Sequence, residues 1–123
     1  MVTADVYIAS SASLVAIAQM VERASGIRLV PLADAGEVCF SGKGEHLGVD
    51  VLWNRGVAGA PRPSEFRYKV EVWARRGDGQ PPRLREREAM ALRIASSLSE
   101  LGLRRVAIAA PPTQSIPEDS LPI

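Results

Sequence analysis

The side chains that could do acid–base or metal chemistry gather in one short segment. His46, the only histidine, follows Glu45 and lies four residues before Asp50. A histidine beside a carboxylate can act as a general base, and histidine is a common metal ligand. A metal site needs three or four donors, however, and Cys39 would be the only soft ligand. We therefore expect a solvated loop histidine, no catalytic residue and no metal site.

The glycines around Lys43 and the single cysteine offer no stronger motif. Gly42-Lys43-Gly44 could present N–H groups and a lysine to a phosphate, but a phosphate-binding loop needs Gly-x4-Gly-Lys-Ser/Thr between a strand and a helix. Both neighbouring segments look like strands, which favours a hairpin turn whose glycines suit positive φ. Cys39 alternates with Val38 and Phe40, which predicts an inert, partly buried residue. The prediction is a protein that is not an enzyme and has no cofactor.

Length and composition indicate one globular domain. The chain has 123 residues, 46% hydrophobic and 24% charged, with a formal net charge of +1. A near-neutral chain without an RNP motif is not typical of a nucleic-acid-binding protein, so a nucleic-acid partner is not expected. We recognise no signal peptide or membrane-spanning run, which favours the cytoplasm. We expect one domain over 1–110 and a Pro-rich extended tail over 111–123.

The longest two-residue alternation runs from Phe66 to Arg75 and predicts a central strand. Successive side chains of a strand point to opposite faces, so this strand has one apolar and one mostly charged face. Shorter patterns predict strands over 5–9, 37–41, 47–53 and 105–109, and helices over 14–24 and from 83 or 84 to Gly102. Residues 27–30 could form a short strand or only a connection, and Pro31 ends this segment. This order predicts an α+β fold: a single antiparallel or mixed sheet with two helices on one face, ferredoxin-like and elaborated.

The sheet face away from the helices is the predicted binding surface. The predicted core comprises Val6, Ile8, Val38, Phe40, Val49, Val51, Val70, Val72, Val106 and Ile108, together with an apolar helix stripe that includes Leu101. The predicted partner-binding residues on the opposite side are Tyr7, Asp50, Leu52, Arg67, Lys69, Glu71, Trp73 and Arg75. Aromatic residues among arginines are enriched at protein–protein hot spots, but the chain's own tail or a second subunit could equally cover Trp73.

The central strand also carries a resemblance to a family. The pattern Phe66-x-Tyr68-x-Val70-Glu71-Val72, followed by a polar turn and an Arg/Ala-rich helix, resembles small bacterial immunity-type proteins of polymorphic toxin systems, and the strand and helix from Asp5 to Gly26 are similar to theirs. Arginine outnumbers lysine thirteen to two, a bias typical of GC-rich bacterial coding. The resemblance implies a cytoplasmic inhibitor that binds a cognate toxin and blocks its active site or substrate access.

Two other functions stay open from the sequence. A ferredoxin-like ligand-binding or regulatory domain could form a homodimer through its sheet. An enzyme could use His46 with Glu45 or Asp50. Neither alternative has a motif of its own, so the protein-binding hypothesis leads.

Overall fold

The computed structural model describes residues 3–34, 37–56, 59–75, 84–103 and 105–109. Asp34-Ala35-Gly36 predicts a turn, and the Gly- and Pro-rich stretch over 77–82 predicts the end of the central strand. Apart from Asp34, these residues and the predicted tail over 111–123 lie outside the described ranges. The described elements, in chain order, are β1 (Ala4–Ala9), α1 (Leu14–Ser25), β2 (Val30–Asp34), β3 (Glu37–Lys43), β4 (Leu47–Trp53), β5 (Tyr68–Ala74), α2 (Leu84–Glu100) and β6 (Arg105–Ala109).

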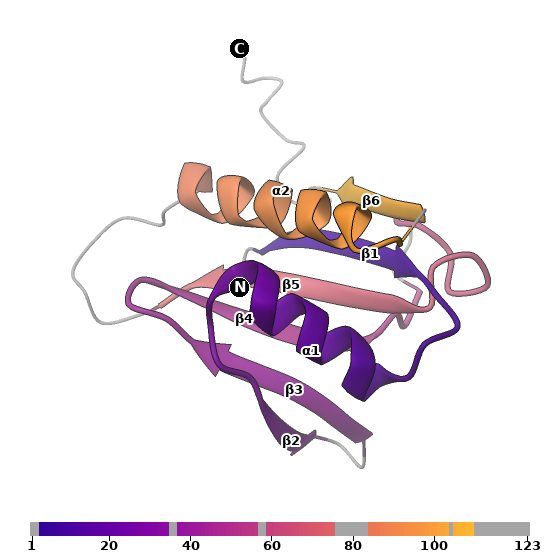
Figure 1. Ribbon diagram of the computed structural model, residues 1–123, viewed down its shortest axis with the longest axis horizontal. Helices are drawn as coiled ribbons and strands as arrows, with labels where there is room; N and C mark the ends of the chain where they lie inside the picture. The colour runs from indigo at the N-terminus through magenta and orange to yellow at the C-terminus, as the bar shows by residue number, and fades with distance from the viewer. Residues whose placement is uncertain (1–2, 35–36, 57–58, 76–83, 104, 110–123) are drawn as a thin grey trace.

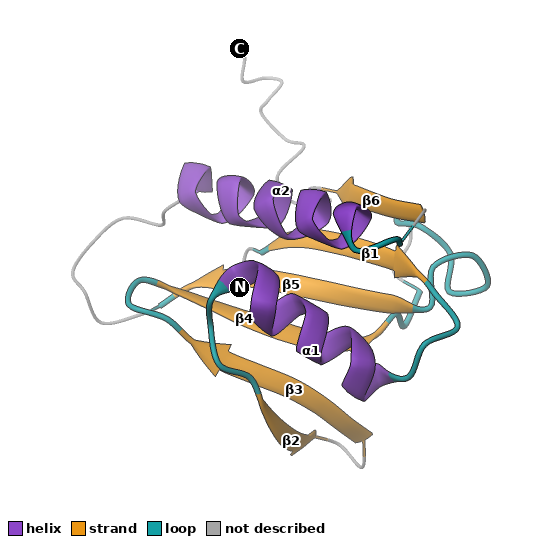
Figure 2. Ribbon diagram, viewed as in Figure 1, coloured by secondary structure: helices purple, strands orange, loops and turns teal. Residues whose placement is uncertain are grey.

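The strands form one antiparallel sheet in the order β2-β3-β4-β5-β1-β6, and both helices cover the same face of it (Figures 1 and 2). The predicted central strand is β5, where Val72 lies opposite Ala4 of β1 and Val49 of β4. Strands β4, β5, β1 and β6 with the two helices make the ferredoxin-like arrangement, which β2 and β3 extend at one edge. The predicted α+β fold class is confirmed.

Local signals at its two ends define α1. The Ser13 hydroxyl accepts a hydrogen bond from the Ala16 N–H at 3.1 Å, which satisfies a backbone donor that the first turn leaves unpaired. Gly26 adopts a left-handed conformation with φ of 75° and donates its N–H to the Glu22 carbonyl. Both signals can be recognised in the sequence, as serines before the predicted helix and a glycine after it. The capped helix buries its apolar stripe against the sheet.

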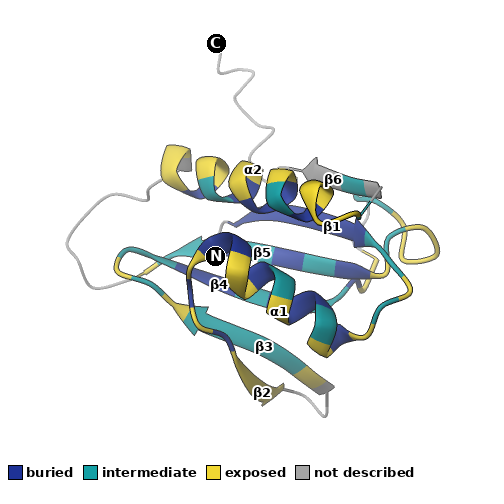
Figure 3. Ribbon diagram, in the orientation of Figure 1, coloured by how far each residue is buried: buried dark blue, intermediate teal, exposed yellow. Residues whose placement is uncertain are grey.

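The core lies between the helices and the covered face of the sheet (Figure 3). Tyr68 is its largest fully buried side chain, 1% exposed, and the Tyr68 hydroxyl donates to the Ala12 carbonyl in the loop before α1. The other side chains at or below 2% exposure on the covered face and the helices are Val6, Ile8, Ile17, Val21, Val49, Val51, Val70, Val72, Ala91, Ile94 and Leu98.

Two residues predicted to be core are exposed instead. Val38 in β3 is 53% exposed and Leu101, just beyond α2, is 44% exposed. The helix α1 packs mainly on β4, and α2 packs on β1, β5 and β6. The β2–β3 end of the sheet therefore has little helical cover, so the alternation that places Val38 on the helix side does not bury it.

Pro31 lies inside β2 rather than ending a strand before it. The Gly44 N–H donates to the Leu47 carbonyl at 2.7 Å, so the backbone groups of Gly44 point toward β4. This direction alternates from residue to residue along an antiparallel strand, so the backbone groups of Cys39, five residues earlier in β3, point toward β2. Leu32 is the partner of Cys39. The nitrogen of the neighbouring Pro31 consequently faces the free edge of the sheet, where its missing N–H removes no bond and denies an incoming strand a donor.

Replacing Pro31 with valine is therefore expected to promote self-association through β2. The new N–H could bond a second sheet, with about 1 kcal/mol gained for each added hydrogen bond. Sedimentation equilibrium of the wild type and the variant measures the effect. Ala33→Val is the matched control because it adds a β-branched side chain to the same strand without adding a donor. Equal self-association of both variants would contradict the role given to the proline.

Candidate binding surface on the open face of the sheet

The sheet face that the helices leave uncovered is called the open face below. Side chains alternate along each strand, so the residues that neighbour core positions in sequence point to this face. The strand register aligns these residues across the sheet in rows. The described side chains of the open face include Asp5, Tyr7, Val30, Leu32, Cys39, Ser41, Lys43, Asp50, Leu52, Lys69, Glu71 and Trp73.

The indole of Trp73 is held in one position on the open face. Gly48 lies opposite Trp73 in the register, and a Cβ on this glycine would overlap ring atoms Cε2, Cζ2 and Cη2, so the indole covers the glycine closely. The Trp73 Nε1–H donates to Asp50 Oδ1 at 3.1 Å, and the Ser41 hydroxyl donates to the same oxygen at 2.6 Å. Trp73 is half-buried, so its ring is fixed by these contacts yet is not sealed inside the core.

Gly48→Ala is expected to displace the indole and to destabilise the fold by about 1–3 kcal/mol, the usual cost of overpacking. The added methyl group would occupy the space of the ring and break the bond between Trp73 and Asp50. Urea unfolding measures the cost, and the Trp73 Nε1–H resonance reports the displacement. In a Trp73→Ala background the same glycine change should cost little, and an undiminished cost there would contradict the contact.

A group of charged residues lies beside the indole, centred on Lys69. The Lys69 ammonium is 3.0 Å from Glu71 Oε2 and 3.9 Å from Asp5 Oδ2, while the Thr3 hydroxyl donates to Asp5 Oδ1 at 2.6 Å. Burial raises the pKa of the Asp5 carboxyl above 3.8. The hydrogen bond from Thr3 and the charge of Lys69 lower this pKa, but they offset the effect of burial only in part. Burial alone would lower the pKa of Lys69, but the bond and charge of Glu71, with Asp5, raise it above 10.5.

The raised pKa of Asp5 predicts how stability depends on pH. The folded chain binds the Asp5 proton more tightly than the unfolded chain, so this contribution is complete below pH 3.8 and is lost as the pH rises through the folded-state pKa. The unfolding free energy of the wild type, measured relative to Asp5→Asn, should fall as the pH rises from 3.8 through the folded-state pKa of Asp5. At higher pH this difference should stay constant. Urea titrations at several pH values test this. A relative free energy that increases with pH would mean a lowered pKa.

The structure does not place every predicted site residue on the accessible surface. Tyr7 is on the open face but is only 2% exposed, with the Lys69 ammonium 5.8 Å from its ring centroid. Arg67 was predicted on the same side of the sheet as Trp73, but its guanidinium lies 5.3 Å from the Trp53 ring and 5.7 Å from the Tyr68 ring, both on the covered face. Arg67 precedes β5, and the alternation of the strand does not extend to it.

The other predicted residues lie on the open face, with one exception at its end. Asp50, Leu52, Lys69 and Glu71 lie on the open face and are partly exposed. Arg75 follows β5, and its guanidinium donates to the Gly44 carbonyl at 3.1 Å in the β3–β4 turn. Arg75 therefore lies at the end of the open face rather than over its centre.

Sequence reasoning missed two apolar residues of the open face. Val30 and Leu32 in β2 are each 51% exposed and extend the face toward the free edge. Their alternation with Pro31 and Ala33 is visible in the sequence, but a proline usually indicates the end of a strand. An edge strand tolerates proline, which is the signal that could have identified these residues.

The candidate phosphate loop has a packing explanation. A Cβ on Gly42 would collide with the Arg28 carbonyl, and one on Gly44 would crowd Ile27, so the segment after α1 requires both glycines. Neither Gly42 nor Gly44 has positive φ, contrary to the prediction.

The candidate histidine site does not assemble either. His46 Nε2 is 3.8 Å from Glu45 Oε2 on an exposed turn, whereas Asp50 binds Ser41 and Trp73. Among the described residues, no group of three or more histidine, cysteine or acidic side chains is arranged to hold a metal.

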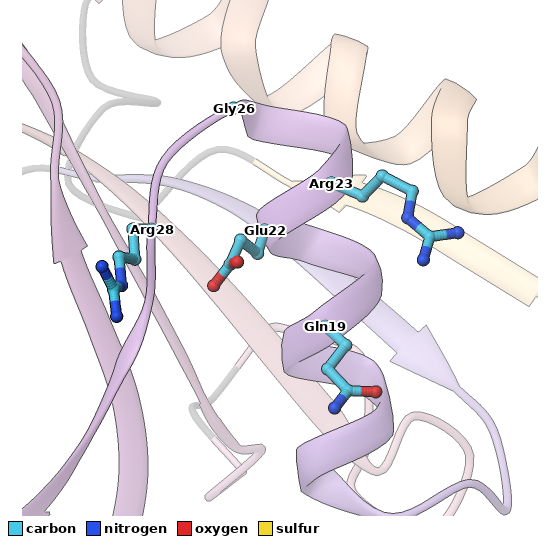
Figure 4. A pocket seen from close by; sticks show the side chains of 5 residues that line it. All are labelled: Gln19, Glu22, Arg23, Gly26 and Arg28. Atoms are coloured by element: carbon cyan, nitrogen blue, oxygen red, sulfur yellow. The ribbon is translucent and has the colours of Figure 1, made fainter.

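An open groove of about 920 Å³ lies on the other side of the molecule, at the C-terminal end of α1 (Figure 4). Glu22 Oε1 in this groove accepts the Leu29 N–H at 2.9 Å and so ties the following segment to the helix. Arg23 points away from Glu22 and Arg28 in Figure 4, so the charged groups do not converge. The remaining lining residues are Gln19 and Gly26.

The fold and this surface together define a two-layer α+β protein with one open sheet face. The sequence matches no protein-family model and has no significant match among curated proteins or solved structures. Neither helix in the described ranges is long and apolar enough to cross a membrane.

Proposed function

We propose that this protein is a non-enzymatic binding protein of the immunity type, which neutralises a cognate bacterial toxin in the cytoplasm by covering it with the open face. The observation that carries the proposal is the half-buried Trp73, fixed over Gly48 and bonded to Asp50 on the side of the sheet without helices. A tryptophan that loses little freedom on binding is typical of an interface hot spot.

The surroundings of the indole suit a protein partner. Asp50 and Glu71 offer charged groups next to Trp73, while partly exposed Leu52 on β4 and exposed Leu32 on β2 extend the open face with apolar contact toward its free edge. A hot spot usually combines an aromatic anchor with neighbours that exclude water, and polar groups then determine specificity. Inhibition would be steric, because a toxin bound on this face would have its active site or substrate path covered by the sheet.

The exposure of Val30 and Leu32 favours a second candidate, a regulatory module dimeric through its sheet. Each of these side chains is 51% exposed, and a second copy packed on the open face could bury them. Sedimentation equilibrium of the protein alone separates the two candidates, since a dimer dissociated by Leu32→Asp would support the regulatory module.

Expression with a toxin tests the leading proposal. The proposal requires that an adjacent gene encodes a secreted protein with a toxin-like C-terminal domain, and this domain is the probe, produced in a bacterial host with and without this protein. We expect growth arrest by the domain alone and recovery when the wild-type protein is present. Recovery should persist with Leu92→Ala, a change at a 58% exposed residue of α2 on the helix side. A purified domain that does not bind the wild-type protein would reject the proposal.

A further inference from the structure

The geometry points to a partner whose contact surface carries arginine side chains, which would pair with Asp50 and Glu71 while one guanidinium stacks on Trp73. The inference rests on the proposed function and adds the chemistry of the partner. It also assigns the open face to a different protein rather than to a second copy of this chain.

The first observation is an imbalance of charge in one row of the sheet. Asp50, Glu71 and Asp5 lie side by side on β4, β5 and β1. Lys69 is the cation that contacts this row, at 3.0 Å from Glu71 and 3.9 Å from Asp5. Asp50 accepts hydrogen bonds from two neutral donors, both at Oδ1. Among the described side chains, the row therefore holds three carboxylates and is contacted by one ammonium, which reaches Glu71 and Asp5 but not Asp50.

The second observation is where this negative charge reaches the surface. The Asp5 side chain is 8% exposed and that of Lys69 11%, whereas that of Glu71 is 26% exposed and Asp50 is partly exposed. Asp50 and Glu71 are therefore accessible to solvent, whereas Lys69 is largely buried. The other described cations of this face, Lys43 and Arg75, lie at the β3–β4 turn, and Arg75 is engaged with the Gly44 carbonyl.

The positions of these charges favour one kind of partner on the open face over another. A second copy packed face to face would bring its own carboxylate row against Asp50 and Glu71, and like charges in a dry interface oppose association. A guanidinium meets both requirements of the site, because it can pair with a carboxylate in bidentate fashion and stack on an indole. Asp50 Oδ2 and Glu71 Oε1 have no hydrogen bond within the described part of the chain and lie on the same face as the Trp73 ring.

A test with small probes needs no toxin. N-acetyl-arginine amide and the neutral N-acetyl-glutamine amide are titrated into the full chain, and the indole Nε1–H resonances of Trp73 and Trp53 are followed by NMR. We expect a saturable shift of the Trp73 signal with the arginine probe alone. Glu71→Gln should weaken that response about two- to fivefold, the range for a partly exposed ion pair. Glu100→Gln, at an exposed position on α2, should leave it unchanged.

Three results would overturn the inference. The first is an equal response to the glutamine probe, and the second is an arginine response that Glu71→Gln leaves unchanged. The third is a dimer of the wild-type chain in sedimentation equilibrium that both Trp73→Ala and Leu32→Asp dissociate. A specific arginine response with a toxin domain that does not bind would reject the immunity function alone. A toxin domain that binds the chain without any arginine response would reject the cationic partner alone.

Discussion

Trp73→Ala is expected to weaken binding of the toxin-like domain by about 2–4 kcal/mol, which corresponds to a Kd at least about 30-fold higher. The indole is the anchor of the open face, and its ring is already fixed by Gly48 and Asp50 before a partner arrives. Truncation removes the apolar contact and also leaves Asp50 with Ser41 as its remaining donor. Both effects should lower the affinity for the partner more than the stability of the fold, because the Trp73 side chain is only half-buried in the free protein.

Isothermal titration calorimetry with the purified domain measures this loss. Leu92→Ala is the matched control, since it also truncates a large side chain but on the helix side of the molecule, where it is 58% exposed. Urea unfolding of each variant separates lost affinity from lost folding. A folded Trp73→Ala protein that binds with unchanged Kd would place the binding surface elsewhere, even if the toxin is the partner.

Tyr68→Ala is expected to lower the unfolding free energy by about 3–5 kcal/mol, the usual cost of removing a large buried aromatic side chain. Tyr68 is 1% exposed, and its ring centroid is 5.0 Å from that of Trp53. Its hydroxyl also donates to the Ala12 carbonyl, so the truncation would leave a cavity and release the loop before α1. Against a typical total of about 5–15 kcal/mol, this change removes much of the stability.

Tyr68→Phe separates the two contributions of this side chain. The phenylalanine keeps the ring and removes the hydroxyl, so we expect a loss of about 0.5–1.5 kcal/mol for the hydrogen bond to Ala12. Urea unfolding of both variants gives the comparison. Equal losses for Phe and Ala would show that the hydroxyl, rather than the ring, provides the stability.

The elements that depend on local pattern were predictable from the sequence. The alternation from Phe66 to Arg75 predicts the central strand, which the structure places at Tyr68–Ala74, and Ser13 and Gly26 lie at the two ends of α1. Caps and two-residue periodicity can be recognised because they act over a few residues. The ferredoxin-like order follows from the succession of these elements. The prediction failed for Val38, since its burial depends on how far α1 reaches across the sheet.

The sequence by itself determined which side chains share a face of β5, because alternation is a property of any strand. Only the tertiary structure decided what those side chains meet. Gly48 and Trp73 are neighbours through the pairing of β4 with β5, and Ser41 reaches Asp50 through the pairing of β3 with β4. Register between strands is set by the packing of the whole sheet, so no local pattern could have shown that a glycine and a carboxylate hold the indole in place.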